Sequence, residues 1–320
     1  MEGLKTFAYL LFLYVVHIIK FLVVDPVYGL CQTFVNLFSN KQMKLKSYFA
    51  GKTVLVTGAS SGIGEALCLE LAALGGNVIL TSRNSNKLNE VASHCQQLAP
   101  QGKFVIAELD MENYHSINYT LCDQLFLKKL VETGLQDSGI DVAILNAGMS
   151  CRGSVADTDI KTIEKLMATN FMGPAALAKC LLPHFFERNR GTIAVVSSVQ
   201  GKMGMPLRSA YAASKYALQG FFDSLRAEVL CKNINILTVS PGYVRTSLSV
   251  NAVNGDGTSY GKLDETTANG MDPKTLSAII LEAIVDKKKD VVAANAKTVL
   301  GIQLNALLPD IFTQMVKLNR

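Results

Sequence analysis

The chain has 320 residues, of which 49% are hydrophobic and 18% are charged, and its formal net charge is +5 at pH 7. So apolar a composition excludes a disordered or low-complexity protein, and so mild a charge argues against a nucleic-acid-binding surface. The seven cysteines are odd in number and include no CxxC pair, so we expect buried or free thiols, no disulfide framework and no metal site.

The first expected element is an apolar segment over residues 7–24, which one histidine and one lysine interrupt. As a helix it would span about 27 Å, close to the thickness of a bilayer core. A cleaved signal peptide is disfavoured because the basic flank is only Lys5 and no small-x-small site follows. We therefore expect a single-pass membrane anchor or, as an alternative, a monotopic hairpin bent at Pro26 that includes the apolar stretch 27–38.

Lysines indicate how such an anchor is oriented. Lys41, Lys44 and Lys46 follow the apolar segment, whereas the preceding flank carries only Lys5, opposed by Glu2. Positive charge is retained on the cytoplasmic side of membranes. The distribution therefore favours a catalytic domain in the cytosol.

From residue 50 onward, short apolar runs alternate with amphipathic stretches. The strand-like runs are 53–57, 77–82, 104–109, 142–145, 192–197, 235–239 and 290–293. The helical stretches between them include 63–74, 118–135, 161–188 and 209–231. This alternation predicts the α/β class, a Rossmann-type doubly wound parallel sheet in a single domain, with ligands at the carboxyl ends of the strands. We divide the chain into an anchor with a basic linker (1–46), a catalytic domain (47–295) and an apolar helical extension (296–320).

A glycine-rich turn joins the first strand to the first helix. Its residues are Thr57, Gly58, Ala59, Ser60, Ser61, Gly62, Ile63 and Gly64. Glycines permit a tight turn and let backbone amides at a helix N-terminus approach a pyrophosphate. A strand before the turn and a helix after it predict a dinucleotide-binding site.

A second motif lies in the helical pattern 209–231. Tyr211 and Lys215 are four residues apart and therefore share one helix face, and Ser198 precedes Tyr211 by thirteen residues. A free phenol has a pKa near 10. We expect the Lys215 ammonium to lower the pKa of Tyr211 and make it a proton donor at neutral pH.

The TGxxxGxG spacing of the turn and the YxxxK of Tyr211 and Lys215 resemble the short-chain dehydrogenase/reductase family, over about residues 50–295. The resemblance implies that Tyr211 donates the proton, that Ser198 binds the substrate oxygen, and that Lys215 holds the nicotinamide ribose. It also implies that Asn170 positions a water. Leu145 departs from the family pattern, which has an asparagine there. The cofactor contacts implied by the resemblance are Thr57, Gly58, Ser60, Ser61, Gly62, Ile63, Gly64, Ser82, Arg83, Asp110, Met111, Asn146, Ala147, Gly148, Tyr211, Lys215, Pro241, Gly242, Val244 and Thr246.

The end of the second strand indicates which nicotinamide is bound. An enzyme that uses NAD usually has Asp or Glu there for the ribose 2′-hydroxyl. Here the strand ends in Ser82, Arg83 and Asn84, with no acid. Arg83 suits a 2′-phosphate, so we expect NADP(H) and reduction of a carbonyl.

The substrate site is expected around a long polar loop, residues 243–271, which has the character of a lid. Met203 and Met205 lie between Ser198 and Tyr211 and could line an apolar pocket or serve ordinary packing. Two arginines, Arg152 and Arg208, lie on either side of Ser198 in the sequence. We expect one of them, with Arg208 as the candidate substrate contact, to meet an anionic headgroup; plain surface charge is the alternative.

The resemblance is greatest to membrane-anchored reductases of the family. It implies a lipid-type carbonyl substrate such as acyl-dihydroxyacetone phosphate, a steroid or retinal, and a homodimer through the helices of Asn170 and Tyr211. We expect the endoplasmic reticulum membrane, with peroxisome, lipid droplet and mitochondrion as alternatives. The rival hypothesis is a non-catalytic nucleotide-binding scaffold or redox sensor. Such a protein would be expected to have lost Tyr211, Lys215 or Ser198.

Overall fold

The computed structural model describes residues 41–118, 126, 128, 132 and 139–318. The apolar stretches 7–24 and 27–38 and most of the expected helix 118–135 lie outside the described residues. Within the described ranges, no helix is both long and apolar enough to cross a bilayer. The chain divides into two compact units, Met1–Tyr48 and Phe49–Arg320; the described part of the first lies in helix α3 (Lys41–Phe49).

A seven-stranded sheet forms the centre of the second unit, in the order β3-β2-β1-β4-β6-β7-β9. Every neighbouring pair is parallel, which confirms the expected doubly wound Rossmann-type sheet. The central strands are buried along their whole length, as parallel strands covered on both faces must be. The strands are β1 (Thr53–Thr57), β2 (Asn77–Ser82), β3 (Phe104–Glu108), β4 (Val142–Leu145), β6 (Gly191–Val196), β7 (Ile234–Pro241) and β9 (Asp290–Ala293).

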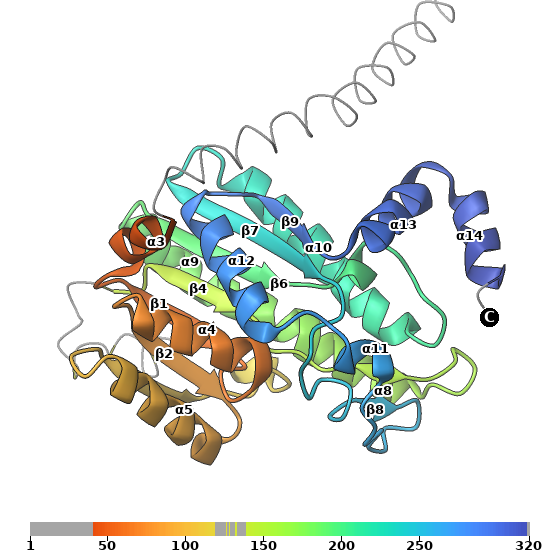
Figure 1. Cartoon of the computed structure of the whole chain (residues 1–320), viewed down its shortest axis with the longest axis horizontal. Helices are drawn as coiled ribbons and strands as arrows, with labels where there is room; N and C mark the ends of the chain where they lie inside the picture. The colour runs from red at the N-terminus through yellow and green to blue at the C-terminus, as the bar shows by residue number, and fades with distance from the viewer. Residues whose placement is uncertain (1–40, 119–125, 127, 129–131, 133–138, 319–320) are drawn as a thin grey trace, which may run out of the picture. The chain divides into compact units, whose positions relative to one another are not determined.

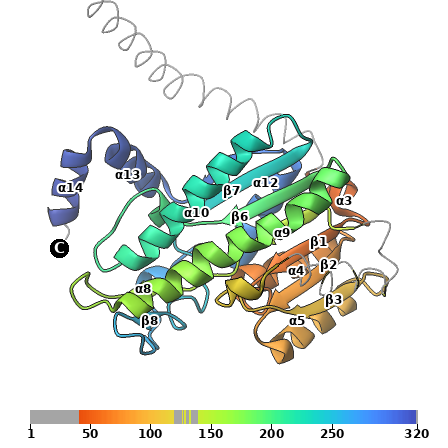
Figure 2. The ribbon, with the colours of Figure 1, turned by 180° about the vertical axis from the view of Figure 1, so that it is seen from behind.

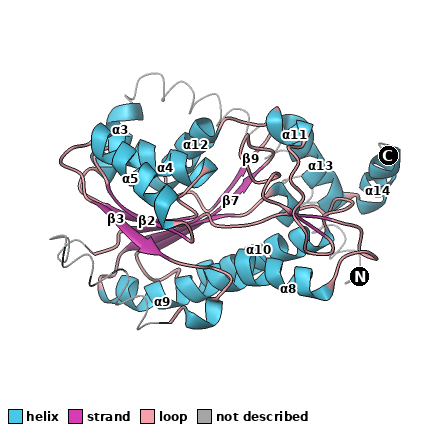
Figure 3. Cartoon of the chain, turned by 90° about the horizontal axis from the view of Figure 1, so that it is seen from below, coloured by secondary structure: helices cyan, strands magenta, loops and turns pink. Residues whose placement is uncertain are grey.

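Helices cover both faces of the sheet, as Figure 3 shows from below. One face carries α4 (Gly62–Ala73), α5 (Ser85–Leu98) and α12 (Pro273–Val285). The other carries α8 (Ile160–Met167), α9 (Gly173–Glu187) and α10 (Ser209–Glu228), which cross the front of Figure 2. The chain winds outward in both directions from β1 and β4, so the sheet reverses between these two strands, where ligands of such sheets bind.

The structure interrupts the expected helix 161–188. A π-helical turn, Ala168–Met172, separates α8 from α9. Pro174 explains the break, because it has no N–H to donate to the carbonyl of residue 170. The turn carries Asn170, whose side chain is fully buried.

The expected lid 243–271 has structure of its own. It contains the short strand β8 (Val253–Asn254) and the helical turn α11 (Glu265–Ala268). Strand β8 pairs in parallel with β5 (Cys151–Arg152), in the segment that follows β4. Two 3₁₀ turns, Tyr114–Ser116 and Val199–Gly201, lie elsewhere in the unit. Helices α13 (Ala296–Leu307) and α14 (Pro309–Leu318) follow β9 (Figure 1).

Candidate active site

The glycine-rich turn leaves β1 and opens α4, as the sequence predicts. Gly58 and Gly62 have φ of +66° and +59°, a region that favours glycine. A side chain at Gly58 would approach the Ala147 Cα to 2.9 Å, and one at Gly64 would overlap the carbonyl oxygen of Gly58. The turn is therefore a cradle of bare backbone, which is what a pyrophosphate at a helix N-terminus requires.

Hydrogen bonds tie this turn to the one that follows β4. The Thr57 hydroxyl accepts from the backbone N–H groups of Asn146 and Ala147, both at 3.0 Å. The side-chain Nδ2 of Asn146 donates to the Thr57 carbonyl, also at 3.0 Å. The two turns therefore hold one another at the point where the sheet reverses. Leu145, the departure from the family pattern, is a core residue with 1% of its surface exposed.

The buried Asn170 joins three parts of the site. Its Oδ1 accepts from the Met149 N–H at 2.8 Å, and its Nδ2 donates to the Met149 carbonyl at 2.9 Å. The same Nδ2 donates to the Ser214 hydroxyl at 2.9 Å. A side chain at Gly148 would lie 3.1 Å from Asn170 Oδ1 and 3.5 Å from Lys215 Nζ. Asn170 thus connects the segment after β4 with helix α10 and comes close to Lys215.

Ser198, Tyr211 and Lys215 come together at the carboxyl end of β6, each less than a tenth exposed. The Lys215 Nζ lies 5.9 Å from the centre of the Tyr211 ring and donates to the Val196 carbonyl at 3.0 Å. Burial lowers the pKa of Lys215 to about 8.

The pKa of Tyr211 moves opposite to the sequence-based expectation. Burial raises it, and a hydrogen bond with Ser198 opposes this rise only in part. The positive charges that lower it come from Arg152 and Arg208. The expected net lowering of the pKa of Tyr211 is therefore wrong for this structure, because desolvation of the phenolate outweighs the nearby positive charges.

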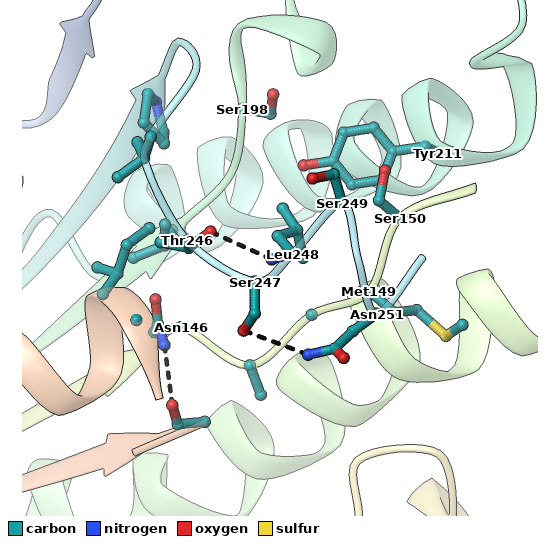
Figure 4. A pocket seen from close by; sticks show the side chains of 18 of the residues that line it. Asn146, Met149, Ser150, Ser198, Tyr211, Thr246, Ser247, Leu248, Ser249 and Asn251 are labelled. Carbon is teal, nitrogen blue, oxygen red and sulfur yellow. Dashed lines mark hydrogen bonds between the residues drawn. The ribbon is translucent and has the colours of Figure 1, made fainter. Parts of the chain in front are cut away.

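One cavity of about 910 Å³ connects these groups. Figure 4 shows part of its lining, including Ser198, Tyr211 and Ser249. Three predicted residues do not line it: Thr57, Gly64 and Asn170 lie behind its wall. The predicted residues that do line it are Gly58, Ser60, Ser61, Gly62, Ile63, Ser82, Arg83, Asp110, Met111, Asn146, Ala147, Gly148, Ser198, Arg208, Tyr211, Lys215, Pro241, Gly242, Val244 and Thr246.

The end of the cavity beside β2 carries two basic side chains, Arg83 and Lys87. Arg83 is largely exposed and lies 4.0 Å from Asp110 and 3.8 Å from Glu112. Such exposed, long ion pairs contribute little free energy, so the guanidinium is free to turn to another anion. Lys87, in the first turn of α5, also lines the cavity, and sequence reasoning missed it.

The two arginines of the substrate region meet at a single carboxylate. Arg152 Nε lies 3.1 Å from Asp264 Oδ2, and Arg208 Nη2 lies 3.5 Å from the same oxygen. The side chains of Arg152 and Arg208 are only 12% and 16% exposed. Plain surface charge, the alternative kept for both, is therefore wrong. Asp264 was not predicted, because nothing in a local pattern connects it with residues more than fifty positions away.

The lining fits a nicotinamide dinucleotide. The bare cradle at Gly58 and Gly62 and the basic groups Arg83 and Lys87 match phosphates. Thr169 Oγ1 and Gln200 Oε1 are buried atoms that have no hydrogen-bond partner within the described part of the chain, and both residues line the cavity. Such orphaned polar atoms at a cavity wall indicate that a polar ligand belongs there.

Solved structures share this fold. A short chain dehydrogenase/reductase from Burkholderia phymatum, in complex with NAD, superposes with a TM-score of 0.69 at 19% identity, over 83% of this chain and 96% of that one. Levodione reductase gives a TM-score of 0.67 at 19% identity, over 78% and 99%. At such low identity the likeness shows the fold.

Sequence relatives are much closer. A dehydrogenase/reductase SDR family protein 7-like of Drosophila melanogaster is 40% identical over 281 residues, 87% of this chain and 83% of the relative. Dehydrogenase/reductase SDR family member 7B of Bos taurus is 38% identical over 288 residues, 89% of this chain and 87% of the relative. The short chain dehydrogenase profile matches residues 52–256. The chain is therefore an oxidoreductase that belongs to the short-chain dehydrogenase/reductase family.

Proposed function

We propose that this protein uses NADPH to reduce the carbonyl group of a lipid-type ketone or aldehyde. The observation that carries the proposal is one continuous cavity that runs from the glycine-rich cradle to the buried Tyr211, with Ser198 and Lys215 beside the phenol. A carbonyl that reaches Tyr211 and a cofactor held by the cradle would share this cavity. Bound NADPH supplies the hydride.

Residues of the chain bind the carbonyl oxygen of the substrate and supply its proton. The Ser198 hydroxyl donates to the carbonyl oxygen and polarises it, and the Tyr211 hydroxyl gives its proton to that oxygen as negative charge develops there. Because burial raises the pKa of Tyr211, the phenol is protonated at neutral pH and ready to donate. The resulting phenolate is stabilised by the Lys215 ammonium and by the charges of Arg152 and Arg208.

The substrate end of the cavity combines apolar and charged groups. Met203, Met205 and Leu248 line it, and so does the partly buried Arg208. Two arginines share one carboxylate there, so the cluster has an excess of one positive charge. An apolar carbonyl compound with an anionic group satisfies both properties, and acyl-dihydroxyacetone phosphate is one such compound. Steroids and retinal supply the apolar part alone.

Tyr211→Phe tests the chemistry directly. The variant keeps the ring and loses the proton, so kcat for NADPH-dependent reduction should fall about 100- to 10,000-fold. The assay follows NADPH oxidation with a panel of phosphorylated and neutral lipid ketones and aldehydes. Tyr216→Phe, one helix position beyond Lys215 and partly exposed, is the matched control and should retain activity. Cofactor binding without turnover on every substrate would instead favour a non-catalytic scaffold.

The pH profile tests the role of Lys215. Its pKa is lowered to about 8, so its positive charge is lost as the pH rises through about 8. The raised pKa of Tyr211 keeps the phenol protonated over the same range. We expect kcat/KM for reduction to be level below this pH and to decline above it. A profile that stays level far beyond pH 8 would mean that the charge of Lys215 does not contribute to stabilising the Tyr211 phenolate.

NADPH is proposed over NADH because of Arg83 and Lys87, which line the cavity beside the end of β2, where no acid follows the strand. Charge-assisted hydrogen bonds from such groups discriminate strongly for a phosphate.

Arg83→Ala should raise the Kd of NADPH about 10- to 100-fold, the effect expected from losing hydrogen bonds to a charged group. The Kd of NADH should change little, because no 2′-phosphate is present. Lys87→Ala should act in the same direction with a smaller effect. Fluorescence titration of both cofactors measures this; an equal loss for NADH and NADPH would contradict the assignment of Arg83 to the 2′-phosphate.

We further propose that residues 7–24 attach the protein to the endoplasmic reticulum membrane, with the catalytic domain in the cytosol. The length and apolar composition of the segment and the lysines after it support this. The full chain should stay with membranes after a carbonate wash, whereas residues 47–320 alone should be released. Release of the full chain by carbonate would rule out a spanning anchor.

A further inference from the structure

Asp264 lies at the centre of a partly buried cluster of polar side chains. Its Oδ2 accepts from Arg152 Nη2 at 2.5 Å and from Arg152 Nε at 3.1 Å. Its Oδ1 accepts from the Tyr260 hydroxyl at 2.8 Å, and the Arg152 guanidinium lies 5.4 Å from the centre of the Tyr260 ring. A carboxylate and a guanidinium that are this well satisfied hold a fixed geometry.

The cluster joins two segments that are far apart in the sequence. Asp264 and Tyr260 belong to the loop 243–271, and Arg152 belongs to the segment after β4 that carries β5. On its other side, Arg152 Nη1 donates to the Ser150 hydroxyl at 2.6 Å and to the Cys151 carbonyl at 3.0 Å. The guanidinium is thus held to its own segment, whose Cys151 belongs to the same buried cluster as Ala210 and Tyr211, and Asp264 fixes the loop to it.

The loop so held covers the proton donor. Val253, in β8, packs against the cluster of Cys151, Leu166, Ala210 and Tyr211. The backbone N–H of Asp264 donates to the hydroxyl of Ser249 at 3.4 Å. Ser249 is 1% exposed and lines the same cavity as Tyr211 (Figure 4). The position of Asp264 therefore sets the position of loop residues that face the substrate.

We propose that Arg152, Asp264 and Tyr260 form a latch that holds the loop 243–271 closed over Tyr211, and that Arg152 and Asp264 are positioning residues for the substrate. The latch also separates the roles of the two arginines. Arg152 uses its Nε, Nη1 and Nη2 atoms within the protein. Among the residues that the structure describes, Arg208 has only a 3.3 Å hydrogen bond to the Cys151 carbonyl and the 3.5 Å ion pair with Asp264, so its charge remains available to a ligand.

Limited proteolysis tests the latch without any assay of activity. Lys262 is an exposed trypsin site between Tyr260 and Asp264. Asp264→Asn keeps the shape of the side chain and removes its charge, so the loop should open more often and cleavage at Lys262 should become about 10-fold faster. Glu265→Gln, the same change of charge at the next and exposed position, should be cleaved at the wild-type rate. Cleavage sites and rates are read by mass spectrometry of the full chain.

Further variants keep the test decisive if Asp264→Asn is unstable, which its melting temperature would reveal. Arg152→Lys keeps the charge but loses the two-point contact and should also speed cleavage at Lys262. Tyr260→Phe loses one hydrogen bond and should have a smaller effect in the same direction. Cleavage at the wild-type rate in Asp264→Asn and Arg152→Lys alike would overturn the latch.

The kinetic part of the inference rests on the proposed carbonyl reduction. Opening of the loop changes the lining of the cavity, whereas Tyr211 and Lys215 belong to α10 and stay in place. Asp264→Asn should therefore raise the KM of the carbonyl substrate about 10-fold and change kcat much less. The Kd of NADPH should change less than this KM, because Val244 and Thr246 are the only predicted cofactor contacts that lie in the loop. Faster cleavage with an unaltered KM would overturn the positioning role. If no substrate turns over in the wild type, the proposed function fails while the proteolysis still decides the latch.

Discussion

The turn after β1 and the turn after β4 approach each other closely where the strand order of the sheet reverses, and the site depends on this contact. Gly58 and Ala147 come so near that no side chain fits at Gly58, and the Thr57 hydroxyl binds two N–H groups of the facing turn. Strands β1 and β4 are neighbours in the sheet although β2 and β3 lie between them in the sequence. The contact therefore fixes the cradle relative to Met149, from which Asn170 and then helix α10 are held.

Burial sets the electrostatics of the proton donor. Removing water disfavours both the phenolate of Tyr211 and the ammonium of Lys215, so the two pKa values move apart: that of Tyr211 rises and that of Lys215 falls to about 8. A site arranged in this way favours the protonated phenol, which is the form that reduction consumes. The charges of Arg152 and Arg208 then matter most after the proton has left, when the phenolate needs stabilisation.

The features that the sequence predicted correctly are those that short segments determine by themselves. The strands, the glycine-rich turn and the spacing of Tyr211 and Lys215 are properties of short segments, and the parallel sheet follows from their alternation. The stretch 161–188 contains two prolines; the helix breaks before Pro174 but continues through Pro183, and periodicity does not distinguish the two positions. The pairing of Arg152 with Asp264 spans 112 residues, and the direction of the Tyr211 shift depends on burial, which no spacing encodes.

A partly buried ion pair gains little net free energy, because desolvating the two charges offsets much of their attraction. An apolar contact would hold the loop at least as strongly. The ionic pair has a different consequence: Asp264 neutralises one of two arginines and leaves the other beside the cavity. With Asp264 absent, two unpaired guanidinium groups would repel each other and draw in water or ions. The loop carboxylate thus limits the cluster of Arg152, Arg208 and Asp264 to one excess positive charge, in keeping with the proposed substrate, which carries one anionic group on an otherwise apolar molecule.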